Sequence, residues 1–354
     1  MSTKVPNITL PKVLEQLNRN YDGFIVISDI DKTYLATQID SIGGLLRTAF
    51  ETPESKDNVP GFSIILRALR RGGEEAPTKV PVFFVSASPP QMRDALLSKM
   101  QIDGVDHDGI VFKDQLEYVR AGEFKKLREQ IGYKTSALLS LWLKAPKKSK
   151  LVLFGDDSES DPVIYSLFEE ILSGRLRGEM LQRMLGYLKV FPEETQKIMN
   201  LVKQLGPECF SPVRYIFINL ASGSQANYYM KYGAHLFATE NSLQVAIALF
   251  EGGLIRERAV GTVGREMVLH YDFEPRKLLQ AAQRGARKGY YSYATLQKLW
   301  LTLFEARAFP PLEDIAEFKT EAVILRDSFL NQKFDSAREY YESLRLRFSE
   351  EGRY

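Results

Sequence analysis

The sequence predicts an α/β protein with a three-layer arrangement, a parallel sheet with helices on both faces, followed by a helical C-terminal region. Short apolar runs, each ending in polar residues, recur along the first part of the chain. Segments with helical patterns lie between these runs, and such alternation is typical of a parallel sheet. After about residue 256 the apolar runs stop, and long charged segments that favour helices follow.

The strand predictions rest on continuous runs of apolar, mostly β-branched or aromatic residues. Such runs indicate strands that are buried on both faces of a sheet. The first is FIVI at 24–27, which leads into DIDKT. The others are VPVFFV at 80–85, KLVLF at 150–154, RYIFIN at 214–219 and a shorter run at 235–238.

Helices are expected between the strands, at 61–71, 90–100, 135–144 and 162–172. The segment 257–354 contains stretches such as RKLLQAAQRGARKG and FDSAREYYESLRLRF, which favour helices. We therefore predict one domain at 1–256 and a helical region at 257–354. The GTVGRE segment near Gly261 is the predicted junction between them, because paired glycines favour turns.

Composition excludes several classes of protein. The chain has 354 residues, 44% of them hydrophobic, and a formal net charge of +2. This hydrophobic content supports a folded core, and the small charge provides no global field for nucleic acid, so no nucleic-acid partner is expected. The single cysteine, Cys209, excludes an intrachain disulfide and a cysteine-based metal site. The chain shows neither a signal-peptide pattern nor a transmembrane run, so we expect a soluble, cytoplasmic protein.

Polar residues follow three of the apolar runs directly. In parallel sheets, functional sites form at the carboxyl ends of the strands, so these residues are the first candidates. They are Asp29 and Asp31, Ser86 and Ser88, and Asp156 and Asp157.

Each candidate motif also has a structural explanation. DIDKT at 29–33 could form an Asx-rich turn or a helix cap, and Ser86 could cap the next helix. Lys134, in GYKTSALLSLWLK, could be a solvated lysine. GDDSESDP at 155–162 could be a solvated acidic loop. The occurrence of all four in order favours a functional site over these alternatives.

Several carboxylates that converge at strand ends repel one another by a few kcal/mol per pair at about 4 Å. A bound divalent cation removes this repulsion. Oxygen ligands without His or Cys favour a hard ion, and Mg²⁺ is the best match. We therefore expect a Mg²⁺ cofactor.

The four motifs together resemble those of a known superfamily. DIDKT, the serine of VSASP, a lysine and GDDSESD occur in the order and strand context of the four motifs of the haloacid dehalogenase (HAD) superfamily of phosphohydrolases. GDDSESDPVIY, SIGGLLRTAF, VSASPPQM and ENSLQVAIALFEGGLI are similar to segments of its actin-patch-associated phosphatidate phosphatase family, which is related to the lipins. The resemblance covers roughly residues 20–256. The chain departs from that family at Lys32, Ala87 and Pro90, where relatives carry Asp, Asn and Trp.

The resemblance implies a HAD-like Rossmannoid fold and a role for each motif residue. Asp29 would be the nucleophile and form an aspartyl-phosphate, since an aspartate is anionic at neutral pH. Asp31 would act as the general acid and then the general base, and Thr33 would steady Asp31 and its loop. Ser86 and the neighbouring Ala87 would bind the substrate phosphoryl group. Lys134 would bind that group as well and offset its charge.

The resemblance also implies a set of metal ligands. Asp29, the backbone carbonyl of Asp31 and Asp156 would hold Mg²⁺. A further acid is either Asp161, from the GDxxxxD spacing, or Asp157, from adjacency. We favour Asp161 and keep Asp157 as a more distant or alternative ligand.

In this superfamily a cap over the site would come from segment 34–79, which is too short for a large lid. A small or absent cap predicts an open site, which suits a bulky phosphorylated substrate. We expect phosphatidate or a related phospholipid, with peripheral membrane contact. The alternatives are a phosphatase of soluble esters, such as a sugar phosphate, a nucleotide or a phosphoprotein, and a catalytically silent phosphate-binding module. The sequence does not indicate the oligomeric state.

Two weaker signals favour structural explanations. His107 and His235 are expected to be structural. A basic stretch could hold an anionic head group, but a solvated helix face is the preferred interpretation. Its cations are Arg276, Lys277, Arg284, Arg287 and Lys288.

Overall fold

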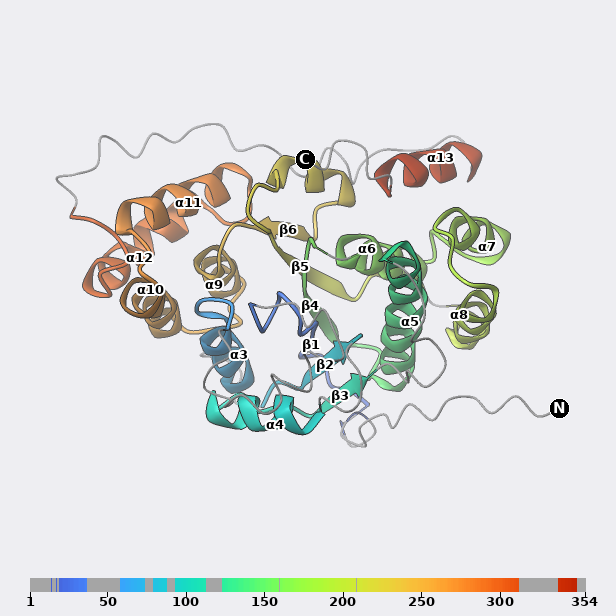
Figure 1. Ribbon diagram of the computed structural model, residues 1–354, viewed down its shortest axis with the longest axis horizontal. Helices are drawn as coiled ribbons and strands as arrows, with labels where there is room; N and C mark the ends of the chain where they lie inside the picture. The colour runs from blue at the N-terminus through green and yellow to red at the C-terminus, as the bar shows by residue number, and fades with distance from the viewer. Residues whose placement is uncertain are drawn as a thin grey trace.

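The protein is described here by a computed structural model. It describes residues 14, 17, 19–36, 58–73, 79–87, 93–112, 123–158, 160–207, 209–311 and 337–348. At its centre is a six-stranded sheet with the strand order β3-β2-β1-β4-β5-β6, and every neighbouring pair is parallel (Figure 1). This arrangement confirms the predicted α/β fold.

All the predicted strands are present, and the structure adds one more. The strands are β1 (Phe24–Ser28), β2 (Val82–Ser86), β3 (Gly109–Phe112), β4 (Lys150–Asp156), β5 (Val213–Asn219) and β6 (Leu236–Thr239). The unpredicted strand is β3, which has four residues, lies at the sheet edge and buries only Val111. A run this short and partly exposed does not produce a clear strand pattern in the sequence.

Helices cover both faces of the sheet, so the fold has three layers (Figure 1). One face packs against α3 (Phe62–Arg71) and α9 (Ser242–Glu251), through residues such as Phe154 and Phe217. The other face packs against α5 (Glu123–Lys144), α6 (Asp161–Leu172), α7 (Gly178–Tyr187) and α8 (Pro192–Gln204). The helix α4 (Arg93–Ile102) follows β2.

The predicted helices lie within or overlap these elements, with some differences. The helix expected at 135–144 begins earlier, because α5 starts at Glu123. The helices α7 and α8 were not predicted. Most of the predicted cap segment, 37–57 and 74–78, lies outside the described residues, and its described part contains α3, which packs on the sheet.

The C-terminal region is helical, as predicted. It contains α10 (Glu257–Tyr271), α11 (Pro275–Arg287), α12 (Tyr293–Glu305) and α13 (Ala337–Arg347). The first three share an apolar core with α3, α9 and one face of the sheet, whereas α13 packs with the helices of the opposite face. The boundary proposed at residue 256 falls just before α10, and it stays a prediction.

The GTVGRE segment, which the sequence suggested as the junction, lies inside α10. Its two glycines serve helix packing. A Cβ on Gly261 would lie 2.9 Å from Cγ2 of Thr302, and a Cβ on Gly264 would lie 2.6 Å from Cβ of Ala308. The glycines therefore allow α10 to approach α12 and the residues after it closely.

No helix in the described ranges has the length and apolar character that crossing a bilayer requires.

Candidate active site

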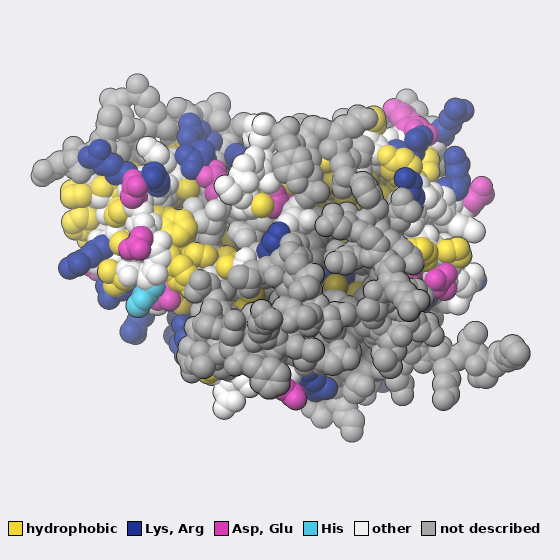
Figure 2. Space-filling model, in the orientation of Figure 1, with side chains coloured by type: hydrophobic (Ala, Val, Ile, Leu, Met, Phe, Trp, Pro, Cys, Tyr) yellow, Lys and Arg dark blue, Asp and Glu magenta, His cyan; other side chains and the backbone are white. Residues whose placement is uncertain are grey.

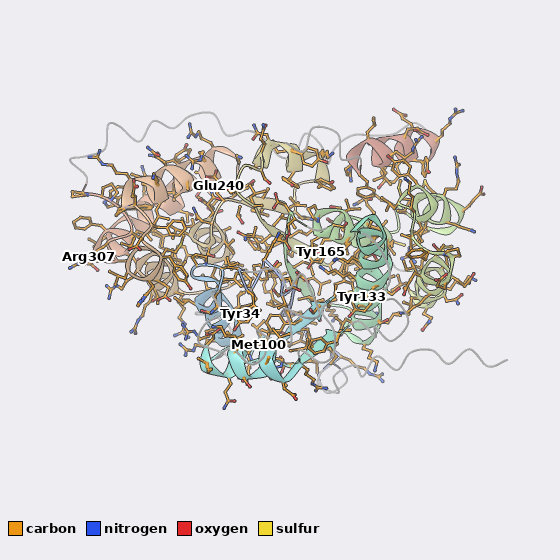
Figure 3. The ribbon with its side chains drawn as sticks, viewed as in Figure 1. Tyr34, Met100, Tyr133, Tyr165, Glu240 and Arg307 are labelled. Atoms are coloured by element: carbon orange, nitrogen blue, oxygen red, sulfur yellow. The ribbon has the colours of Figure 1, made fainter. Side chains whose placement is uncertain are left out.

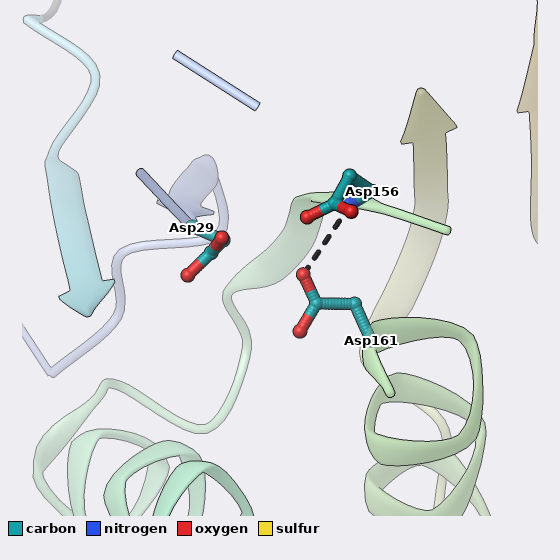
Figure 4. A group of neighbouring side chains, drawn as sticks. All are labelled: Asp29, Asp156 and Asp161. Atoms are coloured by element: carbon teal, nitrogen blue, oxygen red, sulfur yellow. Dashed lines mark hydrogen bonds between the residues drawn. The ribbon is translucent and has the colours of Figure 1, made fainter. Parts of the chain in front are cut away.

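Three buried carboxylates meet at the carboxyl edge of the sheet (Figure 4). Asp29 directly follows β1, Asp156 is the last residue of β4, and Asp161 is the first residue of α6. Each contributes one carboxylate oxygen to a group in which all these oxygens lie within 4.8 Å of one another. All three residues are at most 1% exposed. The adjacency of β1 and β4 in the sheet brings these residues together, although 127 positions separate Asp29 from Asp156.

Lys134 supplies positive charge to this group. It comes from α5, and its side chain is 1% exposed. Its ammonium nitrogen lies 3.0 Å from Oδ1 of Asp29 and 2.7 Å from Oδ1 of Asp161. A buried ammonium is tolerated only beside groups of opposite charge, and here it has two. With all groups ionised, three carboxylates and one ammonium leave an excess of two negative charges.

Gly155 makes the contact between β4 and α6 possible. A Cβ at this position would lie 2.5 Å from Oδ2 of Asp161 and 2.8 Å from the ring of Tyr165. The absence of a side chain lets Oδ2 of Asp161 accept a hydrogen bond from the backbone N–H of Asp156 at 3.3 Å (Figure 4). The glycine of GDDSESD therefore has a steric role in the site.

Tyr165 fixes the orientation of α6 against the sheet (Figure 3). Its hydroxyl donates to the carbonyl oxygen of Phe154 at 2.8 Å. Burial, with the nearby charge of Asp161, raises the pKa of Tyr165 well above its usual value, so the phenol stays protonated and remains a donor.

Asp157 has different surroundings from its neighbour Asp156. Its Oδ1 accepts from the backbone N–H of Ala221 at 2.6 Å, and its Oδ2 accepts from the hydroxyl of Tyr229 at 3.0 Å. Asp157 thereby ties the end of β4 to the 3-10 helix η3 (Ala226–Tyr232) and the loop before it. Of the two alternatives that the sequence left open, the carboxylate group contains Asp161, whereas Asp157 is hydrogen-bonded to the neighbouring loop.

The turn that begins at Asp31 reverses the chain after β1. The backbone N–H groups of Thr33 and Tyr34 donate to the carbonyl of Ile30 at 3.3 and 2.9 Å. Lys32 has a φ of 54°, in the left-handed region that non-glycine residues seldom adopt. The side-chain amide of Asn219 donates to the carbonyl of Lys32 at 3.0 Å and holds this conformation.

Asp31 and Thr33 are buried in this turn, with exposed fractions of 9% and 2%. The group of three carboxylates that forms within the described residues does not include Asp31.

Ser86 and Ala87 lie at the end of β2, beside β1. Ser86 is completely buried and is the last residue of the strand. Because β2 pairs with β1 in parallel, Ser86 reaches the same edge of the sheet as Asp29. Ser88 and Pro90, which the sequence analysis also named, lie outside the described residues.

A cavity of about 320 Å³ reaches the group of carboxylates at Asp156, whereas Asp29, Asp161 and Lys134 do not line it. Its lining includes charged and polar residues as well as apolar ones. The polar ones are Lys32, Asp156, Asp157, Asn219, Glu240, Asn241 and Ser242. The apolar ones are Ala36, Val59, Pro60, Ala221, Met267 and Phe273.

Several of these lining residues were not predicted from the sequence. Asn219 ends β5, and Glu240 and Asn241 directly follow β6, so the rule that identified Asp29 and Asp156 applies to them as well. Met267 and Phe273 come from α10 and the turn after it, and no sequence signal connects them to the motifs. The C-terminal helical region therefore supplies one wall of the cavity.

Comparison with known proteins gives a family match for part of the chain. Residues 24–178 match the family model described as phosphatidate phosphatase APP1, catalytic domain. The matched stretch contains DIDKT, Ser86, Lys134 and GDDSESD, which confirms the resemblance stated from these motifs. No curated protein and no solved structure matches the chain.

Proposed function

We propose that residues 24–178, which match the family model described as phosphatidate phosphatase APP1, catalytic domain, form a HAD-like catalytic domain and that the chain is a phosphatase. We propose that it is a Mg²⁺-dependent phosphomonoesterase that acts through an aspartyl-phosphate, with phosphatidate or a related phospholipid as substrate. The observation that carries the proposal is the buried group of Asp29, Asp156 and Asp161 with Lys134 between two of its members.

Asp29 is the proposed nucleophile. In the first step, a carboxylate oxygen of Asp29 forms a bond to phosphorus as the ester P–O bond breaks, and Asp31 gives its proton to the departing alkoxide. In the second step, water attacks phosphorus and gives a proton to Asp31. The bond between phosphorus and Asp29 breaks, which releases inorganic phosphate and restores the carboxylate.

Lys134 supports this reaction by its charge. Its ammonium lies 3.0 Å from Oδ1 of Asp29 and holds that carboxylate in place by an ion pair. The same charge compensates the negative charge of the phosphoryl oxygens in the transition state. Ser86, at the end of the neighbouring strand β2, is the proposed hydroxyl donor to those oxygens.

The donor set fits a Mg²⁺ ion. Three buried carboxylates with oxygens within 4.8 Å of one another carry more negative charge than Lys134 compensates, and hard oxygen ligands suit this cation. Asp29, Asp156 and the backbone carbonyl of Asp31 are the proposed ligands, with Asp161 as the further acid. When bound, the ion would screen the repulsion between the Asp29 carboxylate and the anionic phosphoryl group.

The lining of the cavity supports an amphiphilic phosphate ester. The lining combines Asp156 and other polar or charged residues with apolar ones, among them Val59, Pro60, Met267 and Phe273. A phosphate at the carboxylates would place the glycerol part of a lipid head group along these apolar residues. Lys32, which also lines the cavity, would add a cation for the phosphate.

The test uses the full chain with an aryl phosphate and with phosphatidate in mixed micelles. We expect turnover that requires Mg²⁺, that Asp29→Asn abolishes and that is faster on the lipid. Asp94→Asn, at an exposed position of α4, is the matched control and should keep full activity. Turnover by the Asp29→Asn variant would refute the nucleophile. A preference for soluble esters would move the proposal to that substrate class, and no turnover on either substrate would favour a silent binding module.

A further inference from the structure

The exposed faces of α10 and α12 carry apolar side chains. Six large hydrophobic side chains are exposed in the described part of the chain, and three of them are Leu269 of α10 and Leu301 and Phe304 of α12. Leu301 and Phe304 are 63% and 42% exposed. They lie three residues apart and therefore point to the same side of α12. Figure 2 shows hydrophobic side chains gathered over α10–α12, at the end of the molecule away from α7 and α8.

Beside this apolar surface lies the basic face of α11. Within residues 274–288 five cations accompany one acid, Glu274, which pairs with Lys277 at 2.7 Å. The side of α11 that contains Leu278, Ala282 and Ala286 is buried in the protein core. Arg276 and Lys277 are exposed, Arg284, Arg287 and Lys288 are partly exposed, and Figure 2 shows Lys and Arg gathered over α11.

A groove of about 690 Å³ connects the basic and apolar surfaces. The first turn of α11 contributes Pro275 and Arg276, and the end of α12 contributes Phe304. Arg307, which Figure 3 shows at the outer edge of the molecule, and Phe309 also line the groove, together with the two acids Glu274 and Glu305. Apolar side chains next to guanidinium groups suit a ligand that has both acyl chains and anionic head groups.

This surface adjoins the catalytic cavity. Phe273 lines the cavity, and the next three residues, 274–276, line the groove. A second connection is the ion pair between Glu240, in the cavity wall, and Arg284 of α11, whose closest N···O distance is 2.6 Å. A lipid surface in contact with α11 and α12 would therefore lie beside the cavity opening.

We propose that the outer surface formed by α10, α11 and α12 is a docking site for the surface of an anionic phospholipid bilayer. The inference rests on the proposed function, because it explains how a phosphatase would meet a phosphate ester that is embedded in a membrane. Leu301 and Phe304 insert among the acyl chains near the head groups. Arg276 and Arg287 attract the anionic lipids, and the bilayer presents head groups to the neighbouring cavity.

The test measures binding of the full chain to vesicles by flotation, without any substrate lipid. The vesicles contain phosphatidylcholine with about 30 mol% phosphatidylglycerol, which mimics an anionic leaflet. We expect the wild type to float with these vesicles and not with pure phosphatidylcholine. The double variant Leu301→Ser with Phe304→Ser should weaken binding about tenfold or more, since it removes two apolar anchors. The double variant Arg276→Gln with Arg287→Gln should weaken it about fivefold per cation.

Two matched controls remove groups of the same kind elsewhere. Ile102→Ser with Leu346→Ser removes two exposed apolar side chains of α4 and α13. Lys148→Gln with Lys203→Gln removes two exposed cations from outside this surface. Both controls should float like the wild type. All variants should hydrolyse a soluble aryl phosphate at the wild-type rate, which also shows that they are folded.

Three results would overturn the docking site: a wild type that does not float, variants that float like the wild type, or equal binding to neutral vesicles. A dimer that the Leu301→Ser and Phe304→Ser changes dissociate, without vesicle binding, would instead assign this surface to a second copy. Failure of the proposed function is seen separately, as absence of turnover on every phosphate ester, because flotation requires no catalysis.

Discussion

The ammonium of Lys134 lies 3.0 Å from Oδ1 of Asp29, and both side chains are almost completely buried. The two residues come from α5 and from the end of β1 and are 105 positions apart. Their contact joins the helical layer on one face of the sheet to the edge that carries the buried carboxylates. It also makes the stability of the fold depend on the balance between the charge of Lys134 and that of the buried carboxylates.

Lys134→Met should abolish turnover and destabilise the protein. The variant leaves the buried carboxylates of Asp29 and Asp161 without their ammonium, and breaking a buried ion pair costs about 3 kcal/mol or more. Denaturant unfolding measures this loss. Added Mg²⁺ should restore part of the stability, because a cation replaces the missing charge. If the variant were as stable as the wild type without added Mg²⁺, Lys134 would not be needed to compensate the buried carboxylates.

Gly155→Ala should impair both folding and catalysis. Its methyl group would lie 2.5 Å from Oδ2 of Asp161, so the start of α6 must move away from β4. We expect a loss of about 1–3 kcal/mol in the free energy of unfolding, as for other overpacked sites. Gly186→Ala, in α7, is the control, since a Cβ there meets no atom within 4 Å. It should be neutral or stabilising, by up to about 1 kcal/mol.

Asp156→Asn should weaken Mg²⁺ binding with little change in the fold. Substitutions of outer-shell residues reduce metal affinity by about 10–100-fold, and loss of a direct carboxylate ligand should cost at least as much. The measurement is the rise in melting temperature with Mg²⁺ concentration, which reports binding to the folded state. The wild type and Asp94→Asn should show the same rise. An unchanged response of Asp156→Asn would remove this residue from the ligand set.

Gly264→Ala should show that α10–α12 are part of the folded unit. The added methyl group would lie 2.6 Å from Cβ of Ala308, so α10 and the residues after α12 must separate. The expected loss is about 1–3 kcal/mol. Because these helices share one core with the sheet, unfolding should remain a single transition, with its midpoint at a lower denaturant concentration. Two separate transitions in the variant would mean that the C-terminal region unfolds by itself.

Acid should destabilise the protein through His107. Burial lowers the pKa of this histidine from its ordinary value of 6.5, although the nearby Asp108 and Asp106 oppose the shift. Below pH 6.5 the unfolded chain therefore binds the proton more readily than the folded protein does, and stability falls as the pH decreases towards the lowered pKa. His107→Gln should flatten this part of the curve of unfolding free energy against pH. An identical slope in the wild type and the His107→Gln variant would contradict the lowered pKa of His107.

Much of the site could be predicted from the sequence because its motifs are local. Asp29 and Asp156 follow continuous apolar strands, and chemistry-bearing residues at such strand ends gather at one edge of a parallel sheet. Glu240 directly follows β6 and satisfies the same rule, but it was not predicted as a site residue. The choice between Asp157 and Asp161 was open in the sequence. In the structure, Asp161 belongs to the group of buried carboxylates. Hydrogen bonds from Ala221 and Tyr229 instead hold the Asp157 carboxylate toward the neighbouring loop.

The C-terminal region shows where local patterns mislead. Two glycines in GTVGRE indicate a turn when only the neighbouring residues are considered. In the folded protein the same glycines lie inside α10, where they make room for Thr302 and Ala308. A contact between segments about 40 residues apart thus overrides the local preference of Gly261 and Gly264 for a turn.

The sequence by itself determined the parallel α/β fold, the order of the four motifs and the residue types of the candidate site. These depend on strand and helix periodicity and on residues that are close neighbours in the chain. Only the tertiary structure decided that Asp161 joins Asp29 and Asp156, and that Met267 and Phe273 form a wall of the cavity. Those outcomes depend on steric fit and hydrogen bonds between distant segments, and they exist only once the layers have packed.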